Sequence, residues 1–505
     1  MTALPMASGR SGAAAATSVR AAAVSPASSM PSASAESSAA APVSRAALLA
    51  SGCGTAIAAV CASGIVVITQ QAQGLWAGLA IACGGAIAFA LARCFAQLAE
   101  HIPSSAGLLA YLGRGLGRDA ALIVALPYLL LSLFLVGAEA SIVGLLLSRI
   151  LPVPSLCCAI GFVVCTWLLC RRGIQLSLRL QALCTWALLL GLGACALTAL
   201  VQSLLAGQLI ARLSAPAPTL DGFATAVAQS LFLFMGFELV TSQTSPVPTR
   251  TLRFALQGSA LVLTAFYALL ALGLACSDLP SLSSLSSLSS LSSLPQLHLA
   301  QQAAGVPAAL LITLLSLLAS YTSFNGALLA LSRLMAALAG MGSVPRQFAQ
   351  LDGRSLLPQT ALTALLLFCI AATLLIHTGG LLWAAIVAAA PTAAVVYAAT
   401  AWARERLPAS RVPTARTAYP PSTIHPPSHR PLWRRLLGRG LAVLLLGLAV
   451  AVLGSVFRPS PAPSTSAAPA SALQVGAIVA AAYALSFAFV LRARSQTRLY
   501  RRTHA

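Results

Sequence analysis

Few residues of this 505-residue chain have side chains that do chemistry inside an apolar environment. The chain has nine acidic residues, and two of them, Glu139 and Glu238, lie deep in long apolar runs, while Arg333 is the corresponding base. An ionisable group in a membrane interior is costly and marks a functional site by default. We therefore predict proton coupling at Glu238 and Glu139, with a structural hydrogen-bonding role as the alternative for each.

Recognisable catalytic machinery is missing from the sequence. The chain has no H-E-x-x-H zinc motif, no G-x-S-x-G nucleophile motif and no phosphate-binding P-loop. Its twelve cysteines lie in or beside apolar runs without metal or redox spacing, so we interpret them as small buried hydrophobic residues. The sequence predicts no enzyme activity, no cofactor and no metal site, and a polytopic membrane enzyme is kept as an alternative.

The composition is that of an integral membrane protein. Apolar residues make up 58% and charged residues only 8% of the chain, and the mean hydropathy is +0.89. A soluble domain carries about 25% charged residues, because water must wet its surface. A helix that crosses the bilayer needs about 20 mostly apolar residues, and its backbone must be paired internally. Twelve runs meet this condition: 47–69, 75–98, 119–147, 152–170, 178–204, 223–244, 254–276, 306–338, 357–377, 380–401, 436–457 and 472–491.

The positive charge predicts the orientation of these spans. The net charge of +21 comes from thirty arginines, and the chain has no lysine. With both termini in the cytoplasm, only Arg149, Arg212 and Arg458 fall outside, which agrees with the positive-inside rule. The charge is thus explained by topology and contact with the lipid bilayer, and no nucleic-acid partner is needed. We predict a multi-pass protein of a cell membrane, with a bacterial inner membrane as the expected location.

The segments between the spans complete the predicted organisation. Residues 1–44 are rich in Ala, Ser and Pro and predict a disordered cytoplasmic tail. Residues 45–401 form the core, 277–305 a low-complexity extracytoplasmic loop and 402–435 a Pro- and Arg-rich cytoplasmic linker. The last two spans occupy 436–491, and 492–505 form a basic cytoplasmic tail.

Two glycines lie near mid-depth of the first and sixth spans. Gly64 follows Ser63 in the first, and Gly236 precedes Phe237-Glu238 in the sixth. Interrupted helices at corresponding positions of two halves indicate a transporter binding site. Close helix packing is the alternative role for each glycine.

Four stretches together resemble the amino acid–polyamine–organocation permeases. They are SGIVVIT (63–69), the segment 94–117 with CFAQLAEHIPSSAGLLAYLGRGLG, the segment 232–256 beginning FLFMGFELVTSQ, and the segment 325–351 with NGALLALSRLMAALAGMGSVPRQFAQL. The resemblance implies an all-α membrane fold of twelve transmembrane helices. It would be a leucine-transporter-like 5+5 inverted repeat, about 45–204 and 222–401, plus two peripheral helices.

The same resemblance implies a site. The substrate would be held where the first and sixth helices unwind, by Ser63, Gly64 and Ile65 and by Phe234, Met235 and Gly236, with a carboxylate on free helix amides. Phe232 and Phe237 would act as an occluding gate and Arg333 as an inner gate, with lipid contact, packing or snorkelling as the alternatives. The Gly-x-Glu at Glu238 is similar to the branch that exchanges basic amino acids and polyamines. Sodium held near Thr322 and Ser323 is the rival to proton coupling.

The sequence also departs from the family pattern. Residues 245–249 lack the acidic pair that the family has after its sixth helix, and Gln97 stands where an acid is usual. We therefore predict a secondary transporter of an amino acid or related amine, coupled to protons or working by exchange, with a transport-inactive relative as an alternative. The exact substrate, the direction of transport and whether the protein is a homodimer are left open.

Overall fold

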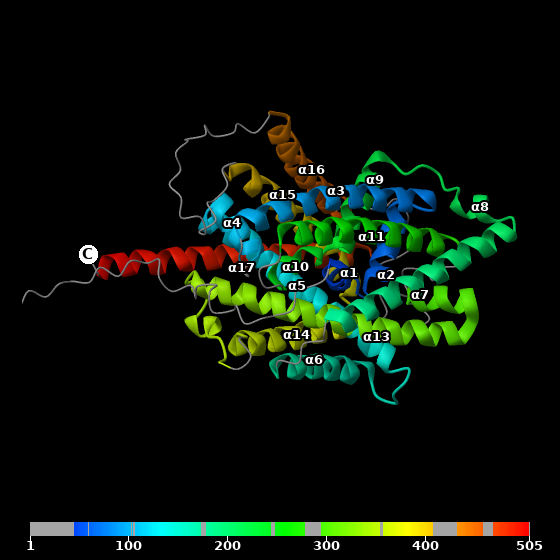
Figure 1. Cartoon of the computed structure of the whole chain (residues 1–505), viewed down its shortest axis with the longest axis horizontal. Helices are drawn as coiled ribbons and strands as arrows, with labels where there is room; N and C mark the ends of the chain where they lie inside the picture. The colour runs from blue at the N-terminus through cyan, green and yellow to red at the C-terminus, as the bar shows by residue number, and fades with distance from the viewer. Residues whose placement is uncertain are drawn as a thin grey trace, which may run out of the picture. The chain divides into compact units, whose positions relative to one another are not determined.

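The structure is a computed structural model that describes residues 45–58, 60–102, 104, 107–172, 178–243, 248–277, 294–353, 357–407, 432–457 and 468–503. Over these ranges every regular element is a helix (Figure 1). Ten described helices are long and apolar enough to cross a membrane, and a further pair, bent by 62°, passes the same test as one span. The shorter apolar helix α6 occupies the fourth predicted run. The predicted all-α membrane fold is thereby confirmed.

The first half of the core contains the first five spans. Its helices are α1 (Arg45–Ala56), α2 (Val60–Gln71), α3 (Leu75–His101), α4 (Leu108–Leu116), α5 (Arg118–Leu147), α6 (Ser155–Arg171) and α7 (Leu178–Leu205), followed by the short α8 (Leu209–Leu213). The pair α1 and α2 is the bent span. Helix α4 is a short helix outside the set of spans.

The second half repeats this order and also begins with an interrupted span. Its elements are α9 (Leu220–Ser230), the 3₁₀ turns η1 (Leu231–Phe234) and η2 (Phe237–Leu239), α10 (Val240–Gln243), α11 (Thr249–Ala275), α13 (Pro295–Gly340), η4 (Arg346–Ala349), α14 (Gln359–Gly379) and α15 (Leu382–Arg406). Two series of five spans, each opening with a broken helix, form the 5+5 arrangement that the resemblance implies.

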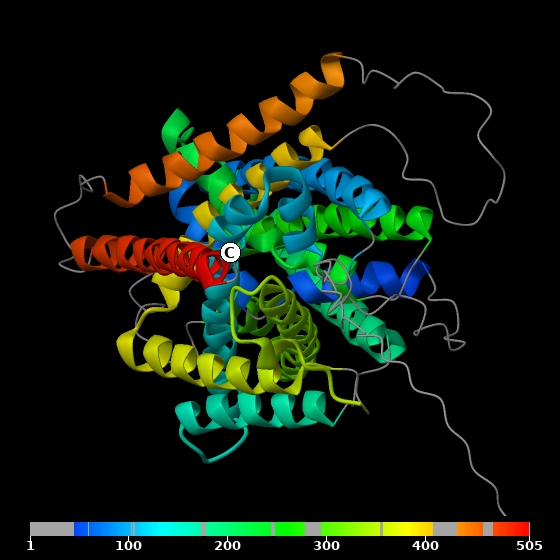
Figure 2. The ribbon, with the colours of Figure 1, turned by 90° about the vertical axis from the view of Figure 1, so that its left-hand side faces the viewer.

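Packing brings the two series together. Helix α3 packs along α11, α7 packs along α13, and α5 packs against both α6 and α14. Figure 2 shows α6 and α14 side by side. The interrupted sixth span and α15 are the most enclosed of the candidate spans, because 83% of each apolar window is buried. The core of the fold therefore surrounds the sixth span and α15.

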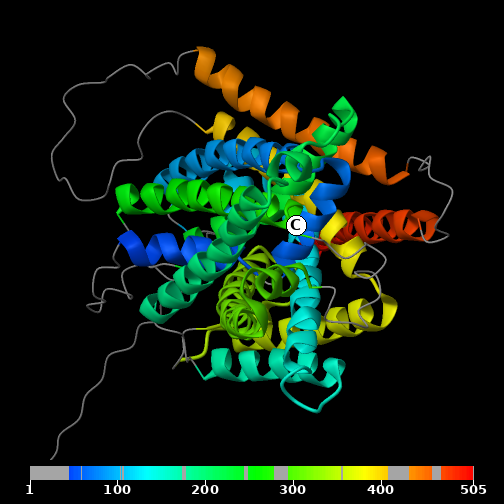
Figure 3. The same cartoon turned by 90° about the vertical axis from the view of Figure 1, so that its right-hand side faces the viewer.

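The two remaining spans lie at the periphery. Helices α16 (Leu432–Phe457) and α17 (Ala468–Thr503) pack against α15, and α17 also contacts α5 (Figure 3). Large apolar side chains such as Leu190 of α7, Leu367 of α14 and Val450 of α16 remain more than 60% exposed. Such side chains suit contact with lipid tails.

Several loop boundaries differ from the sequence prediction. The end of the predicted loop 277–305 is helical from Pro295 and breaks at Ala304 and Gly305, where Gly305 has a φ of +75°. Buried Leu299 and Ala300 explain this helix, because they anchor it to the core. The predicted basic tail from residue 492 continues α17 as helix to Thr503. The predictions for 1–44, for the repeat within 278–293 and for most of the linker, 408–431, lie outside the described residues.

Candidate site at two broken helices

The first span is interrupted between Ala56 and Val60. In a continuous helix the Val60 amide would donate to the Ala56 carbonyl. Here the Val60 N–H instead donates to Glu139 Oε2 at 2.9 Å, and the Tyr267 hydroxyl donates to the Ala56 carbonyl at 3.1 Å. Buried backbone groups need a partner. Two side chains from α5 and α11 therefore replace the helical bond and stabilise the break.

The predicted position of this break, at Ser63, Gly64 and Ile65, was wrong. All three residues lie buried within the regular helix α2. At Gly64 a Cβ atom would come within 2.5 Å of the Phe232 ring. The glycine here allows close packing between α2 and η1, which was the alternative to unwinding.

The sixth span is interrupted at Met235 and Gly236, as expected. Gly236 has a φ of +106°, a left-handed conformation that glycine adopts readily and other residues rarely do. A Cβ atom on Gly236 would lie 2.5 Å from the Thr55 carbonyl oxygen. Both the backbone conformation and the available space therefore require glycine at this position.

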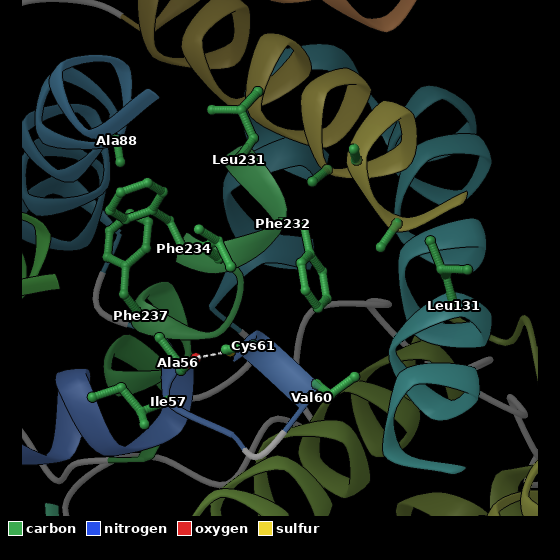
Figure 4. Packing of buried hydrophobic residues seen from close by; sticks show 14 of the residues in the cluster. Ala56, Ile57, Val60, Cys61, Ala88, Leu131, Leu231, Phe232, Phe234 and Phe237 are labelled. Atoms are coloured by element: carbon green, nitrogen blue, oxygen red, sulfur yellow. Dashed lines mark hydrogen bonds between the residues drawn. The ribbon is translucent and has the colours of Figure 1, made fainter. Parts of the chain in front are cut away.

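The two breaks lie against each other. The Thr55 hydroxyl, near the end of α1, donates to the Gly236 carbonyl at 2.9 Å. From α13, the Ser323 hydroxyl donates to the Thr55 carbonyl at 3.3 Å. Figure 4 shows the phenylalanines of the sixth span beside the first break, where Cys61 Sγ donates to the Ala56 carbonyl at 3.3 Å. Polar backbone from two spans thus meets in the middle of an apolar bundle.

Glu139 is one of two buried carboxylates at these breaks and is 3% exposed. Besides the Val60 amide, it accepts a hydrogen bond from the Ser320 hydroxyl of α13. The amino end of a helix carries a partial positive charge that favours an anion. Glu139 therefore connects α5, α13 and the start of α2.

Glu238 is the second carboxylate and is also 3% exposed. It accepts hydrogen bonds from the Tyr128 hydroxyl of α5, from the Tyr397 hydroxyl of α15 at 3.2 Å and from the Gly236 amide at 3.1 Å. These bonds hold the unwound turn against two neighbouring spans. The contacts support the structural role and leave proton coupling as a prediction.

The three phenylalanines of the sixth span are buried in different surroundings. Phe232 packs on Gly64, and Phe234 makes an edge contact with Tyr267 at a ring distance of 6.1 Å. Phe237 lies edge-on to Phe95 of α3 at 6.0 Å. The gating roles predicted for Phe232 and Phe237 remain predictions.

Arg333 connects α13 to the end of the sixth span. Its guanidinium donates to the Ser242 carbonyl. The bond joins α13 to the end of the sixth span at a segment that the sequence predicts to face the cytoplasm. The predicted inner gate would therefore be held closed by this hydrogen bond.

A pocket opens beside the first break. Its lining includes Ala58 and Cys61 of the first span, Phe266 and Tyr267 of α11, and Ser316 of α13. Leucines of α7 and α11 add apolar surface, and Gln296 of α13 adds a side-chain amide. Phe232, Phe234 and Phe237 are not among the lining residues. The pocket is thus formed by the first break and by spans from both halves.

Two kinds of cation site can be compared with the described residues. Among them, no group of three or more His, Cys, Asp or Glu is placed to hold a metal ion. Thr322 donates its hydroxyl to the Ala319 carbonyl, and Ser323 donates directly to the Thr55 carbonyl. A hydroxyl that donates its proton keeps oxygen lone pairs that can bind a cation, so sodium at Thr322 and Ser323 stays an alternative.

Sequence reasoning missed the partners of these groups. Tyr128, Tyr267 and Tyr397 are fully or nearly buried, and each donates to a break or to its carboxylate. A usable signal was present, because a tyrosine inside an apolar run needs a partner for its hydroxyl. Thr55 and Ser320 gave no such signal, since hydroxyls in helices usually bond to their own backbone.

Comparisons with known proteins bear on the family and the fold. The family model described as amino acid permease matches residues 44–418. No match was found among curated protein sequences. The structure of a manganese transporter from Eremococcus coleocola, in complex with an aromatic bis-isothiourea substituted compound, is similar with a TM-score of 0.51 and 15% identity, covering 89% of this chain and 94% of that one. A mutant of that transporter gives a TM-score of 0.50 at the same identity and coverage. At this identity the likeness concerns the fold alone.

Proposed function

Because the chain belongs to the amino acid permease family, we propose that it is a secondary active transporter of amino acids or related amines. Ten described helices are long and apolar enough to cross a membrane, as expected of a multi-pass transporter. The single observation that carries the proposal is the meeting of two helix breaks at Thr55 and Gly236. Such breaks expose polar backbone to a ligand at mid-depth.

In this proposal, alternating access is a movement of the broken spans relative to their neighbours. Hydrogen bonds between the moving spans suit this movement, because they can break and re-form in each transport cycle. The Arg333 bond to Ser242 would hold the inner end of the sixth span against α13 and open when the site faces the cytoplasm. The side-chain bonds of Glu139 and Tyr267 would preserve the first break in both states.

Proton coupling is assigned to Glu238, with Glu139 as the second candidate. A carboxyl group fully enclosed in the bundle is unstable as an isolated anion. The hydroxyls of Tyr128 and Tyr397 stabilise the Glu238 anion by hydrogen bonds. When the site changes state and these bonds weaken, a proton bound to the carboxyl group would compensate for part of the lost stabilisation. Exchange of one amine for another is the alternative to proton coupling.

We also propose that the protein resides in a bacterial inner membrane with both termini in the cytoplasm. The distribution of arginines supports this orientation. A homodimer is compatible with the proposal but is not required by it.

Uptake into liposomes tests the function. The purified full-length chain would be reconstituted and supplied with radiolabelled amino acids and amines, with and without an imposed pH gradient. We expect saturable uptake of at least one compound, increased by the gradient or by a preloaded amine. The absence of uptake across the panel, with correctly folded protein in the vesicles, would contradict the proposal and favour a transport-inactive relative or an enzyme.

A further inference from the structure

Helix α15 is among the most enclosed spans, yet it carries an exposed tryptophan at the end that the arginine distribution predicts to face the cytoplasm. Trp402 is 42% exposed, whereas 83% of the apolar window of α15 is buried. The Arg406 guanidinium lies over the Trp402 ring, 5.9 Å from the ring centre. Tryptophan is enriched at the level of the lipid headgroups, where its ring meets both apolar and polar surroundings. Trp402 therefore marks the depth at which α15 leaves the hydrocarbon layer.

Two other helices meet α15 at this end through close contacts made at glycines. A Cβ atom on Gly115 of α4 would lie 2.6 Å from the Ala403 Cα atom. A Cβ atom on Gly438 of α16 would lie 2.7 Å from the Glu405 Cγ atom. The last turn of α4 and the first turns of α16 are thus held against one turn of α15.

Three exposed arginines stand next to these contacts in the chain. They are Arg114 of α4, Arg406 of α15 and Arg439 of α16, which we call the arginine patch. Among the described residues, none accepts a hydrogen bond from any of the three guanidinium groups. Stacking on Trp402 covers one face of Arg406, but the N–H donors lie in the plane of the guanidinium and stay accessible at its edge. The arginine patch therefore offers donors from three helices at one end of α15.

The acidic residues nearby do not neutralise the arginine patch. Glu405 forms an ion pair with Arg404, and the two side chains are only 7% and 14% exposed. The Arg404 guanidinium also donates to Gln97 Oε1 of α3 at 2.6 Å, which fixes this pair inside the bundle. At the start of α5, Arg118 and Asp119 have opposite charges and leave the balance unchanged. This end of α15 therefore keeps a net positive charge at the level of the headgroups.

We propose that the arginine patch binds the phosphate headgroup of an anionic phospholipid whose acyl chains lie along Trp402. The fork of N–H donors on arginine matches the oxygens of a phosphate group. A zwitterionic lipid brings a cation of its own, which offsets its phosphate, so an anionic lipid suits the patch better. The bound headgroup would reduce the repulsion among the three arginines and hold α4 and α16 against α15. The lipid is a partner of the protein and is distinct from any transported substrate.

Quenching of Trp402 by brominated lipids tests this proposal. The purified full-length protein would be reconstituted into phosphatidylcholine liposomes that contain an equal fraction of brominated phosphatidylglycerol or brominated phosphatidylcholine. The difference between the wild type and Trp402→Phe isolates the Trp402 signal, since phenylalanine keeps an aromatic ring under Arg406. Each arginine near the membrane surface strengthens the binding of an anionic lipid about fivefold. We therefore expect phosphatidylglycerol to be preferred at Trp402 by about tenfold or more.

Substitutions separate the arginine patch from the general positive charge of the protein. The triple variant Arg114→Gln, Arg406→Gln, Arg439→Gln keeps polar side chains, and we expect it to be quenched equally by both lipids. Arg406→Gln alone should lower the preference about fivefold. Arg171→Gln is the matched control, because Arg171 also lies over a tryptophan, Trp167, at 5.2 Å, but on α6, which packs against α5, α13 and α14. This control should leave the preference at Trp402 unchanged.

The possible results lead to different conclusions. A preference for phosphatidylglycerol that the triple variant loses and Arg171→Gln keeps supports the proposal. Equal quenching of the wild type by both lipids, or a preference that the triple variant retains, overturns it. If soluble glycerol phosphate removes the preference, the patch binds free phosphate and the lipid proposal is wrong. If the triple variant does not fold, the wild-type ratio and Arg406→Gln decide. Because no step measures uptake, the result does not depend on the proposed transport function.

Discussion

Replacing Gly236 by alanine is the sharpest test of the geometry at the sixth span. The residue has a φ of +106°, and a Cβ atom would meet the Thr55 carbonyl oxygen at 2.5 Å. A left-handed conformation costs a non-glycine residue about 1–2 kcal/mol. Forcing an atom into a closely packed site costs about 1–3 kcal/mol more. We therefore expect Gly236→Ala to reduce the free energy of unfolding by about 3 kcal/mol.

The same substitution should also separate the two breaks. The added methyl group pushes Thr55 away and weakens its 2.9 Å bond to the Gly236 carbonyl. Thermal unfolding in detergent, followed by tryptophan fluorescence, would give the loss of stability. Uptake per folded molecule in liposomes would give the loss of transport. We expect a loss of at least about tenfold, because destabilising the arrangement of the two breaks by 1.4 kcal/mol lowers its population about tenfold.

Gly447→Ala is the matched control. Gly447 lies within α16, and a Cβ atom there meets no atom within 4 Å. Alanine in a helix interior is favoured over glycine by about 0.5–1 kcal/mol, so this variant should be as stable as the parent or slightly more so. If Gly236→Ala unfolds and transports like Gly447→Ala, the proposed close contact between the two breaks is incorrect.

Four further substitutions, two of them combined in one variant, test neighbouring residues. Gly64→Ala should destabilise the protein by about 1–3 kcal/mol because its Cβ would meet the Phe232 ring. The added change Phe232→Leu should recover part of this loss in thermal unfolding, and full additivity would argue against the contact. Thr55→Val removes the hydroxyl that bonds to Gly236 and should cost about 1 kcal/mol in unfolding free energy; an unchanged melting temperature would contradict that bond's contribution. Glu238→Gln should abolish the stimulation of uptake by a pH gradient while exchange continues, and unaltered stimulation would assign proton coupling elsewhere.

Much of the fold follows from the sequence alone. The apolar runs are long, and most of them are separated by arginine- or proline-containing segments, so their number and approximate limits follow from bilayer thickness and polarity. The break of the sixth span was predictable because a glycine, Gly236, and an acid, Glu238, lie two residues apart in the middle of an apolar run. The sequence predicts a helix break correctly where residues at the break itself cause it.

The break of the first span was misplaced because its cause is not local. No glycine or proline stands between Ala56 and Val60, and Gly54 before them lies within α1, whereas Gly64 lies near the middle of the apolar run and was the visible candidate. The break is stabilised by Glu139 and Tyr267, which are 79 and 211 residues away from their backbone partners. Only the tertiary packing brings these side chains to Val60 and Ala56.

Substrate protection of Cys61 tests the central claim most directly. Cys61 lines the pocket beside the first break, so it would be kept as a single cysteine after the other eleven of the twelve are replaced and uptake is verified. Labelling by 2-aminoethyl methanethiosulfonate, a small cationic thiol reagent, would be followed with and without a transported compound. If the broken helices form the substrate site, Cys61 is labelled and saturating substrate slows the reaction. If Cys61 is labelled at the same rate with and without substrate, or is never labelled during transport, the substrate does not pass between the two breaks.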